Sequence, residues 1–191
     1  MALRDQIAVP LSSDKLQMVD IIEKEFKNAG LPPEFAAAAL VNAHHESGLN
    51  PTIKSAFPGE DSVGLFQLNI RGAGAGMVLA DGTDLRTDPV LNTRRIIEEV
   101  QSHWGKAMRA AYESGERKIS TFASLFSRDI ERPADKEGNM KKRAETALKF
   151  FPSDSVKSFG LATSTGGLIT IGIVSGVSIL LLYYFLRNRK A

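Results

Sequence analysis

Cysteine is absent from the 191 residues of the chain. A chain without thiols contains no disulfide, no cysteine-ligated zinc and no cysteine nucleophile. An excess of charge of one sign is also lacking, because 24 basic and 22 acidic side chains leave a formal net charge of only +2. This balance does not favour a nucleic-acid partner, which usually requires a basic surface. Hydrophobic residues make up 43% of the chain, as in a globular protein.

The sequence also lacks the pattern of an N-terminal signal peptide, because Asp5 interrupts the region where an apolar run would follow Arg4. The C-terminal region is different. Residues 166–186 contain no charged side chain, and roughly 20 apolar residues in a helix span a bilayer. We therefore expect a single-pass C-terminal anchor in a lipid bilayer. Gly172 and Gly176 form a GxxxG motif that is compatible with helix–helix self-association.

The remaining residues have the periodicity of a mostly α-helical domain. We expect helices over residues 13–29, 33–46, 89–111, 120–131 and 133–151. A short β-hairpin is expected around residues 58–61, where Pro, Gly, Glu and Asp follow one another. The predicted segments are a domain (1–152), a linker (153–165), a transmembrane helix (166–186) and a basic tail (187–191).

Glu46 is the side chain with the strongest indication of chemistry. It lies at the predicted end of an alanine-rich helix, which Ser47 and Gly48 terminate. The partial negative charge of a helix C-terminus disfavours an ionised carboxylate, and burial acts in the same direction. Both effects would keep Glu46 protonated near neutral pH, as a general acid for a glycosidic oxygen requires. Taken alone, Glu46 would be better explained as a solvated helix-end residue.

Three segments strengthen the assignment. Residues 46–51 (ESGLNP) and 64–69 (GLFQLN) together resemble the lysozyme-like lytic transglycosylases. Residues 130–135 (IERPAD), with Arg143 downstream, resemble the phage tail lysozyme branch of that superfamily. The resemblance covers roughly residues 14–151 and implies a mostly α, α+β lysozyme-like fold, with the hairpin at the active-site cleft.

The resemblance implies a substrate and roles for individual residues. The substrate would be the glycan strands of peptidoglycan, cleaved at the β-1,4 bond between MurNAc and GlcNAc. Glu46 would act as acid and then as base. Ser47, Gln67 and Asn69 would form the substrate site, with Ser47 orienting Glu46. The family's Ala-Tyr-Asn-Ala-Gly motif is only faintly echoed here, by residues 111–115, so no role is assigned to Tyr112.

The reaction product depends on whether a second carboxylate faces the sugar. Hydrolytic glycosidases normally need one, and Glu60 and Asp61 are the candidates. Their alternative interpretation is a solvated turn, which favours an anhydro-forming transglycosylase over a hydrolytic muramidase. Neither reaction needs a cofactor, and no metal site is expected, because the adjacent His44 and His45 point about 100° apart on a helix.

Three other features favour structural roles. Trp104 lies on the apolar stripe of the third predicted helix and is expected in the core. Glu131 and Arg132 indicate an ion pair or a helix junction, and residues 141–143 (KKR) indicate a solvated basic face.

The compartment is constrained by the substrate. Peptidoglycan lies outside the cytoplasmic membrane, whereas the sequence shows no export signal. A bacteriophage particle would resolve this conflict by carrying the enzyme to the wall from outside. We therefore expect a virion-associated protein in a virion or host membrane, acting on the periplasmic side, although the basic residues on both flanks leave its orientation open. A late lysis protein and a non-catalytic virion scaffold are the alternatives.

Overall fold

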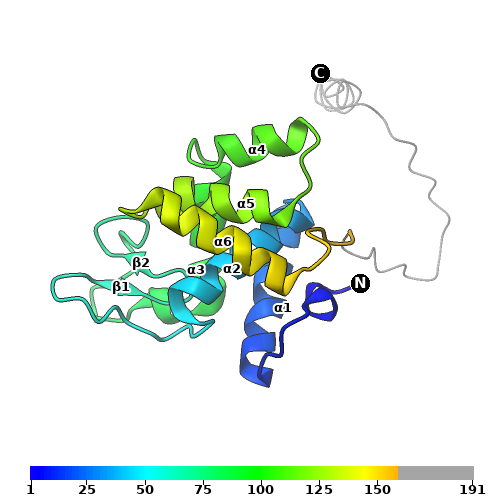
Figure 1. The fold of residues 1–191 in the computed structure, drawn as a ribbon. Helices are drawn as coiled ribbons and strands as arrows, with labels where there is room; N and C mark the ends of the chain where they lie inside the picture. Colours follow the sequence, from blue (N-terminus) through cyan, green and yellow to red (C-terminus); the bar gives the residue numbers. More distant parts are fainter. Residues whose placement is uncertain (159–191) are drawn as a thin grey trace, which may run out of the picture. The chain divides into compact units, whose positions relative to one another are not determined.

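The computed structural model describes residues 1–158, which belong to one compact unit (Figure 1). The predicted transmembrane helix at 166–186, its GxxxG motif and the basic tail lie outside the described residues. Within residues 1–158, no helix is both long and apolar enough to cross a bilayer.

The described residues are mostly helical, as the sequence predicts, and contain one two-stranded antiparallel sheet. In chain order the elements are η1 (Leu3–Gln6), α1 (Ser13–Asn28), α2 (Pro33–Ser47), β1 (Ser62–Val63), β2 (Leu68–Asn69), η2 (Leu85–Thr87), α3 (Pro89–Gln101), α4 (Lys106–Glu113), α5 (Ile119–Phe126), η3 (Ser127–Glu131) and α6 (Lys136–Phe150). Helices α1 and α2 match their predicted ranges to within a residue.

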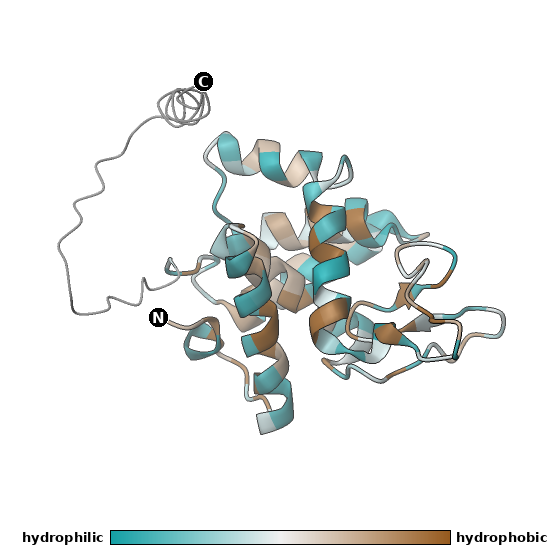
Figure 2. Ribbon diagram, turned by 180° about the vertical axis from the view of Figure 1, so that it is seen from behind, coloured by the Kyte–Doolittle hydropathy of each residue, from teal (hydrophilic) through white to brown (hydrophobic). Residues whose placement is uncertain are grey.

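Helix α2 forms the centre of the fold and packs against α1, α5 and α6. Every residue from Glu34 to Ala43 is buried, because the small alanine side chains allow neighbouring helices to approach closely. The other helices alternate hydrophobic and hydrophilic segments along their ribbons (Figure 2), the pattern of helices with one buried face. The chain emerges from the core only in the last turn of α2, where Glu46 lies.

The single long helix predicted over residues 89–111 is wrong, because the structure divides it into α3 and α4. Ser102 adopts an extended backbone and ends α3. Arg109 then donates hydrogen bonds to the carbonyl oxygens of Val100 and, at 2.8 Å, Ser102. Gly105 is required at this break, since a Cβ there would lie 1.8 Å from the Val100 oxygen. Asp88 caps the start of α3, because its carboxylate accepts hydrogen bonds from the N–H groups of Val90 and Leu91.

The small sheet is held to the helices by buried polar side chains. Its register pairs Ser62 with Asn69 and Val63 with Leu68. The predicted turn at 58–61 lies earlier, in the loop between Lys54 and Val63, which form an isolated antiparallel bridge.

Arg86 is the main polar anchor of this region. Its guanidinium donates hydrogen bonds to the backbone oxygens of Asp61 (2.8 Å) and Leu68 (3.2 Å). The same group forms ion pairs with the Asp61 and Asp84 carboxylates, both at 2.8 Å. Arg86 itself is almost fully buried, so these hydrogen bonds and ion pairs hold the sheet to the protein interior.

Candidate active site

Glu46 occupies the last turn of α2, where the buried helix reaches the surface. Its side chain is 27% exposed. Gly48 ends the helix in the left-handed conformation (φ 60°), and its N–H donates to the His44 carbonyl oxygen at 2.9 Å. The carboxyl group therefore stands on a rigid, fully packed helix and is still open to a ligand.

Arg143 of α6 binds the Glu46 carboxylate. Arg143 Nη2 lies 2.5 Å from Glu46 Oε1 and 3.0 Å from Glu131 Oε2, so one guanidinium nitrogen serves two carboxyl groups. The prediction that residues 141–143 form a solvated face is wrong for Arg143, which is buried, while Lys141 and Lys142 are exposed. Glu131 does form an ion pair, but its partner is Arg143 and not the adjacent Arg132, which lies 4.0 Å from Glu99.

Asn42 positions Arg143 from one helical turn before Glu46. Arg143 Nε donates to Asn42 Oδ1 at 2.9 Å. The Asn42 amide donates in turn to the carbonyl oxygens of Ala38 (2.8 Å) and Ala123 (3.2 Å). Buried hydrogen bonds thus join α2, α5 and α6 beneath Glu46. The oxygen and the nitrogen of the Asn42 side-chain amide both have hydrogen-bond partners.

The carboxyl groups of Glu46 and Glu131 both bind protons more tightly than usual. Burial is the main cause that raises the pKa of Glu46, while Arg143 opposes this and the negative charge of Glu60 reinforces it. Burial, and then the charge of Glu46, raise the pKa of Glu131 to about 8, again against the influence of Arg143. The site is therefore built to retain a proton near neutral pH.

Glu131 is held behind Glu46 by an unusual backbone. It ends the π-helical turn η3, and Arg132 follows in the left-handed conformation with φ 56°. A π turn inside an otherwise α-helical run often marks a functional site. The Glu131 side chain is only 8% exposed, and within the described residues its Oε1 atom has no hydrogen-bond partner. A buried carboxylate oxygen left in this way favours the protonated form of the group.

The predicted substrate residues lie where the hairpin meets the end of α2. The Ser47 hydroxyl lies 2.9 Å from the carbonyl oxygens of both Ala43 and Leu65, so it ties the helix end to the hairpin turn. Gln67 has a left-handed backbone (φ 46°), and its amide donates to the Gly64 and Ile53 oxygens.

Asn69 is also engaged within the hairpin region. Its Oδ1 accepts from the Arg71 N–H at 2.9 Å, and its amide lies 3.3 Å from the Ser62 hydroxyl. The hydrogen bonds of Ser47, Gln67 and Asn69 thus shape this region. Their roles in substrate binding stay predictions.

The two candidate second carboxylates differ in their surroundings. Asp61 is paired with Arg86 and contributes to the anchoring of the sheet. Glu60 accepts hydrogen bonds from the hydroxyls of Ser55 (3.0 Å) and Ser62 (2.9 Å), and its charge acts on Glu46. Of the two, Glu60 is the carboxylate whose negative charge raises the pKa of Glu46.

The two histidines before Glu46 have separate environments. The His44 ring packs against Phe150, with 4.9 Å between centroids. His45 Nε2 lies 2.6 Å from the Thr146 hydroxyl, and burial together with Arg143 lowers the pKa of His45 to about 4. Burial also lowers the pKa of His44, so both rings are neutral near pH 7. Within residues 1–158, no group of three or more His, Asp or Glu side chains is placed to hold a metal ion.

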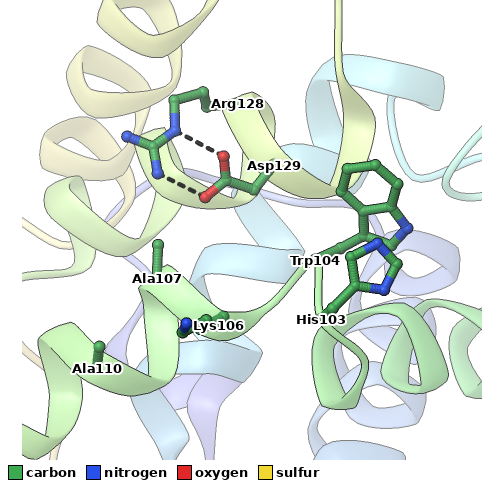
Figure 3. Close-up of a pocket in the computed structure, with 7 residues that line it drawn as sticks. All are labelled: His103, Trp104, Lys106, Ala107, Ala110, Arg128 and Asp129. Carbon is green, nitrogen blue, oxygen red and sulfur yellow. Dashed lines mark hydrogen bonds and ion pairs between the residues drawn. The ribbon is translucent and has the colours of Figure 1, made fainter.

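Trp104 is not a core residue, contrary to the sequence-based expectation, because it is 40% exposed at the break between α3 and α4. It lines a surface pocket of about 480 Å³ with His103 and the Arg128–Asp129 ion pair (Figure 3). The His103 ring centroid lies 4.3 Å from that of Trp104, and the Arg132 guanidinium lies 4.2 Å from the indole centroid. The indole ring is therefore already in contact with two protein groups.

Sequence reasoning missed the role of Asn42 and placed Arg143 on the surface. A signal for Asn42 was present, because an amide four residues before Glu46 in a run of buried alanines lies on the same helix face. Arg143 was part of the resemblance to the phage tail lysozymes, but the basic run that it closes indicated a solvated face. The packing of α6 on α2 buries it.

Comparison with known proteins identifies the class to which this fold and site belong, that of lysozyme-like proteins that act on the cell wall. More narrowly, the family model of the phage tail lysozymes matches residues 18–153, and the chain belongs to that family. No curated protein and no solved structure shows a significant match. The matched residues run from within α1 to just past α6 and include the three segments on which the resemblance was based.

Proposed function

We propose that this protein is a membrane-anchored lytic transglycosylase that cleaves the β-1,4 bond between MurNAc and GlcNAc in peptidoglycan. The proposal rests on two properties of Glu46 at the end of α2. Burial raises the pKa of its carboxyl group, and its side chain is still 27% exposed. A general acid for a glycosidic oxygen needs both properties, a retained proton and access to the bond.

The reaction would use one carboxyl group twice. Glu46 donates its proton to the glycosidic oxygen, the bond to the anomeric carbon breaks, and positive charge develops on the sugar ring. The ionised Glu46, stabilised by Arg143 at 2.5 Å, then removes the proton of the sugar's own 6-hydroxyl. That oxygen bonds to the anomeric carbon, which forms a 1,6-anhydro ring and returns the proton to Glu46.

The preference for the anhydro product rests on the hairpin. Asp61 is held in an ion pair by Arg86, which leaves Glu60 as the candidate that could activate a water molecule. Two serine hydroxyls hold Glu60 within its own loop. A hydrolytic muramidase is the alternative, and the influence of the Glu60 charge on Glu46 is the observation that favours it.

The anchor and the place of action are proposed from the sequence. Residues 166–186 would hold the domain at a virion or host membrane, where it would open the wall locally as the phage genome enters the cell. A late lysis protein or a non-catalytic scaffold would share the fold. A scaffold has no need of a proton-retaining carboxyl group at the end of α2, and this argues for catalysis.

Mass spectrometry of digested peptidoglycan tests the activity. The full chain in non-ionic detergent is incubated with purified sacculi beside Glu46→Gln and a surface control, Glu145→Gln on the exposed side of α6. Anhydro-ended fragments from wild type and Glu145→Gln, but not from Glu46→Gln, would support the proposal. Reducing-end fragments would identify a muramidase, and no cleavage by a folded wild-type chain would favour the scaffold.

Purified particles test the location. We expect the protein in virions that have been washed free of host material, and its extraction from them by detergent. Its absence from particles, together with accumulation late in infection, would instead indicate a lysis protein.

A further inference from the structure

We propose that Glu131 is the second carboxyl group of this site and that it shares a single proton with Glu46 across Arg143. The inference rests on the proposed function of Glu46 and assigns Glu131 as a positioning residue. Glu131 does not reach the sugar in this role. It determines when Glu46 is able to donate a proton.

The same guanidinium nitrogen of Arg143 contacts both carboxyl groups. Arg143 Nη2 lies 2.5 Å from Glu46 Oε1 and 3.0 Å from Glu131 Oε2. The two carboxylate oxygens can therefore be no farther apart than the sum of these distances. Asn42 fixes the guanidinium from the other side through Nε, so Arg143 cannot follow one carboxylate and abandon the other without breaking a buried hydrogen bond.

Charge balance then requires a proton. One cation and two carboxylates carry a net charge of −1 when both acids are ionised, and the side chains of Arg143 and Glu131 are only 5% and 8% exposed. An uncompensated charge in such a place is strongly unfavourable. With one proton the group is neutral, and two interacting carboxyl groups that share one proton titrate as a pair.

Among the described elements around the pair, Arg143 is the cation that contacts both carboxyl groups. Helix α5, which packs against α6, carries no charged side chain. His45 precedes Glu46 on α2 and is neutral near pH 7. Glu60 faces Glu46 from the hairpin and adds a further negative charge. On η3, Arg128 is occupied by Asp129 at 2.6 Å.

The nearest remaining cation in the sequence is also engaged elsewhere. Arg132, the residue after Glu131, lies over the Trp104 ring and 4.0 Å from Glu99. The surroundings of Glu46 and Glu131 thus favour retention of the proton by the pair, and Arg143 is the cation that acts against it.

The pair differs in function from the two carboxylates of a hydrolytic glycosidase. Those groups face each other across the sugar, whereas Glu131 lies behind Glu46 at the end of η3 and is 8% exposed. Glu131 is thus placed to exchange a proton with Glu46 and not to attack the sugar or activate water. This arrangement suits an enzyme that uses one carboxyl group as both acid and base.

The pH dependence of cleavage tests the inference. Initial rates of sacculus solubilisation are measured from pH 4.5 to 9 with the full chain in detergent, for wild type, Glu131→Gln, Glu131→Asp, Glu46→Gln and the control Glu145→Gln. Glutamine at 131 imitates the protonated acid permanently and leaves Glu46 ionised beside Arg143. We therefore expect the alkaline limb of Glu131→Gln to move at least one unit lower, an at least tenfold loss near pH 7.5.

Glu131→Asp, which restores an ionisable group, should return the alkaline limb toward its wild-type position, and Glu145→Gln should leave the profile unchanged. An active Glu131→Gln with the wild-type alkaline limb would overturn the inference while leaving the proposed function intact. An active Glu46→Gln would instead remove the proposed function itself.

Infrared spectroscopy of the wild-type chain provides a second test that does not depend on a variant folding. A protonated carboxyl group absorbs in a region separate from ionised carboxylates. We expect such a band to persist at pH 7 and to disappear between pH 7 and 9. A wild-type spectrum without this band at pH 7 would contradict the shared proton.

Discussion

Arg143 Nε and Asn42 Oδ1 form a 2.9 Å hydrogen bond that joins residues 101 positions apart in the sequence. Because Asn42 and Glu46 lie one turn apart on α2, this bond sets the height at which the guanidinium meets the Glu46 carboxylate. The catalytic candidate is thus held by a buried amide that no substrate would touch. The organisation of the site is a property of the packing of α6 on α2.

Glu46→Gln should abolish cleavage while preserving the fold. Loss of a general acid typically lowers the rate about 10²- to 10⁴-fold, and here the same group also serves as the base. The measurement is the initial rate of sacculus solubilisation, with circular dichroism to confirm that the variant is folded. Glu145→Gln removes the same charge from an exposed site and should retain wild-type activity. Comparable rates for both variants would exclude Glu46 as the acid.

Glu60→Gln should lower activity by less than about tenfold and should leave the anhydro product unchanged, because removal of one neighbouring charge alters the proton affinity of Glu46 only modestly. Product analysis by mass spectrometry checks this, with Asp81→Asn in an exposed loop as the matched control. A loss as large as that of Glu46→Gln, together with reducing-end products from wild type, would assign Glu60 to a hydrolytic mechanism.

Asn42→Ala should destabilise the domain by about 2 to 3 kcal/mol, since it leaves the buried Arg143 Nε and the Ala123 carbonyl oxygen without a partner. Activity measured well below the unfolding midpoint should also fall, because Arg143 is no longer oriented toward Glu46. Urea unfolding gives the free energy. The exposed Asn28→Ala on α1 provides the control, and equal stability of the two variants would contradict the structural role of Asn42.

Stability should decline as the pH rises from about 4.5 to about 8. At low pH Glu131 is protonated in both the folded and the unfolded chain, so it adds no pH dependence to the free energy of unfolding. Between its ordinary pKa of 4.5 and the folded value of about 8, the unfolded chain releases this proton while the folded chain retains it. The free energy of unfolding then decreases with pH, by up to about 1.4 kcal/mol per unit.

Burial also raises the pKa of Glu46 in the wild-type chain, which acts in the same direction. Glu131→Gln removes one titrating group and leaves Glu46 ionised beside Arg143, so the slope should be flatter than in wild type. Urea titrations of wild type and Glu131→Gln at pH 5, 6.5 and 8 measure the difference. Parallel pH profiles for the two proteins would show that Glu131 is ionised in the folded state.

The sequence by itself determined the helices with strong local signals. Helix α1 follows from its apolar spacing, and α2 from a proline at its start and a glycine just past its end. The prediction that Glu46 is the catalytic acid also came from the sequence, because its position at a helix end and the motifs around it are local features. These depend on contacts within a few residues, which periodicity and capping describe well.

Only the tertiary structure decided how the site works. The break between α3 and α4 depends on Arg109 and Gly105 meeting the end of α3, and the exposure of Trp104 follows from that break. The grouping of Glu131 and Arg143 around Glu46 depends on how α6 and η3 pack against α2. Burial and long-range charge pairing arise only when distant segments meet, so no local pattern in the chain records them.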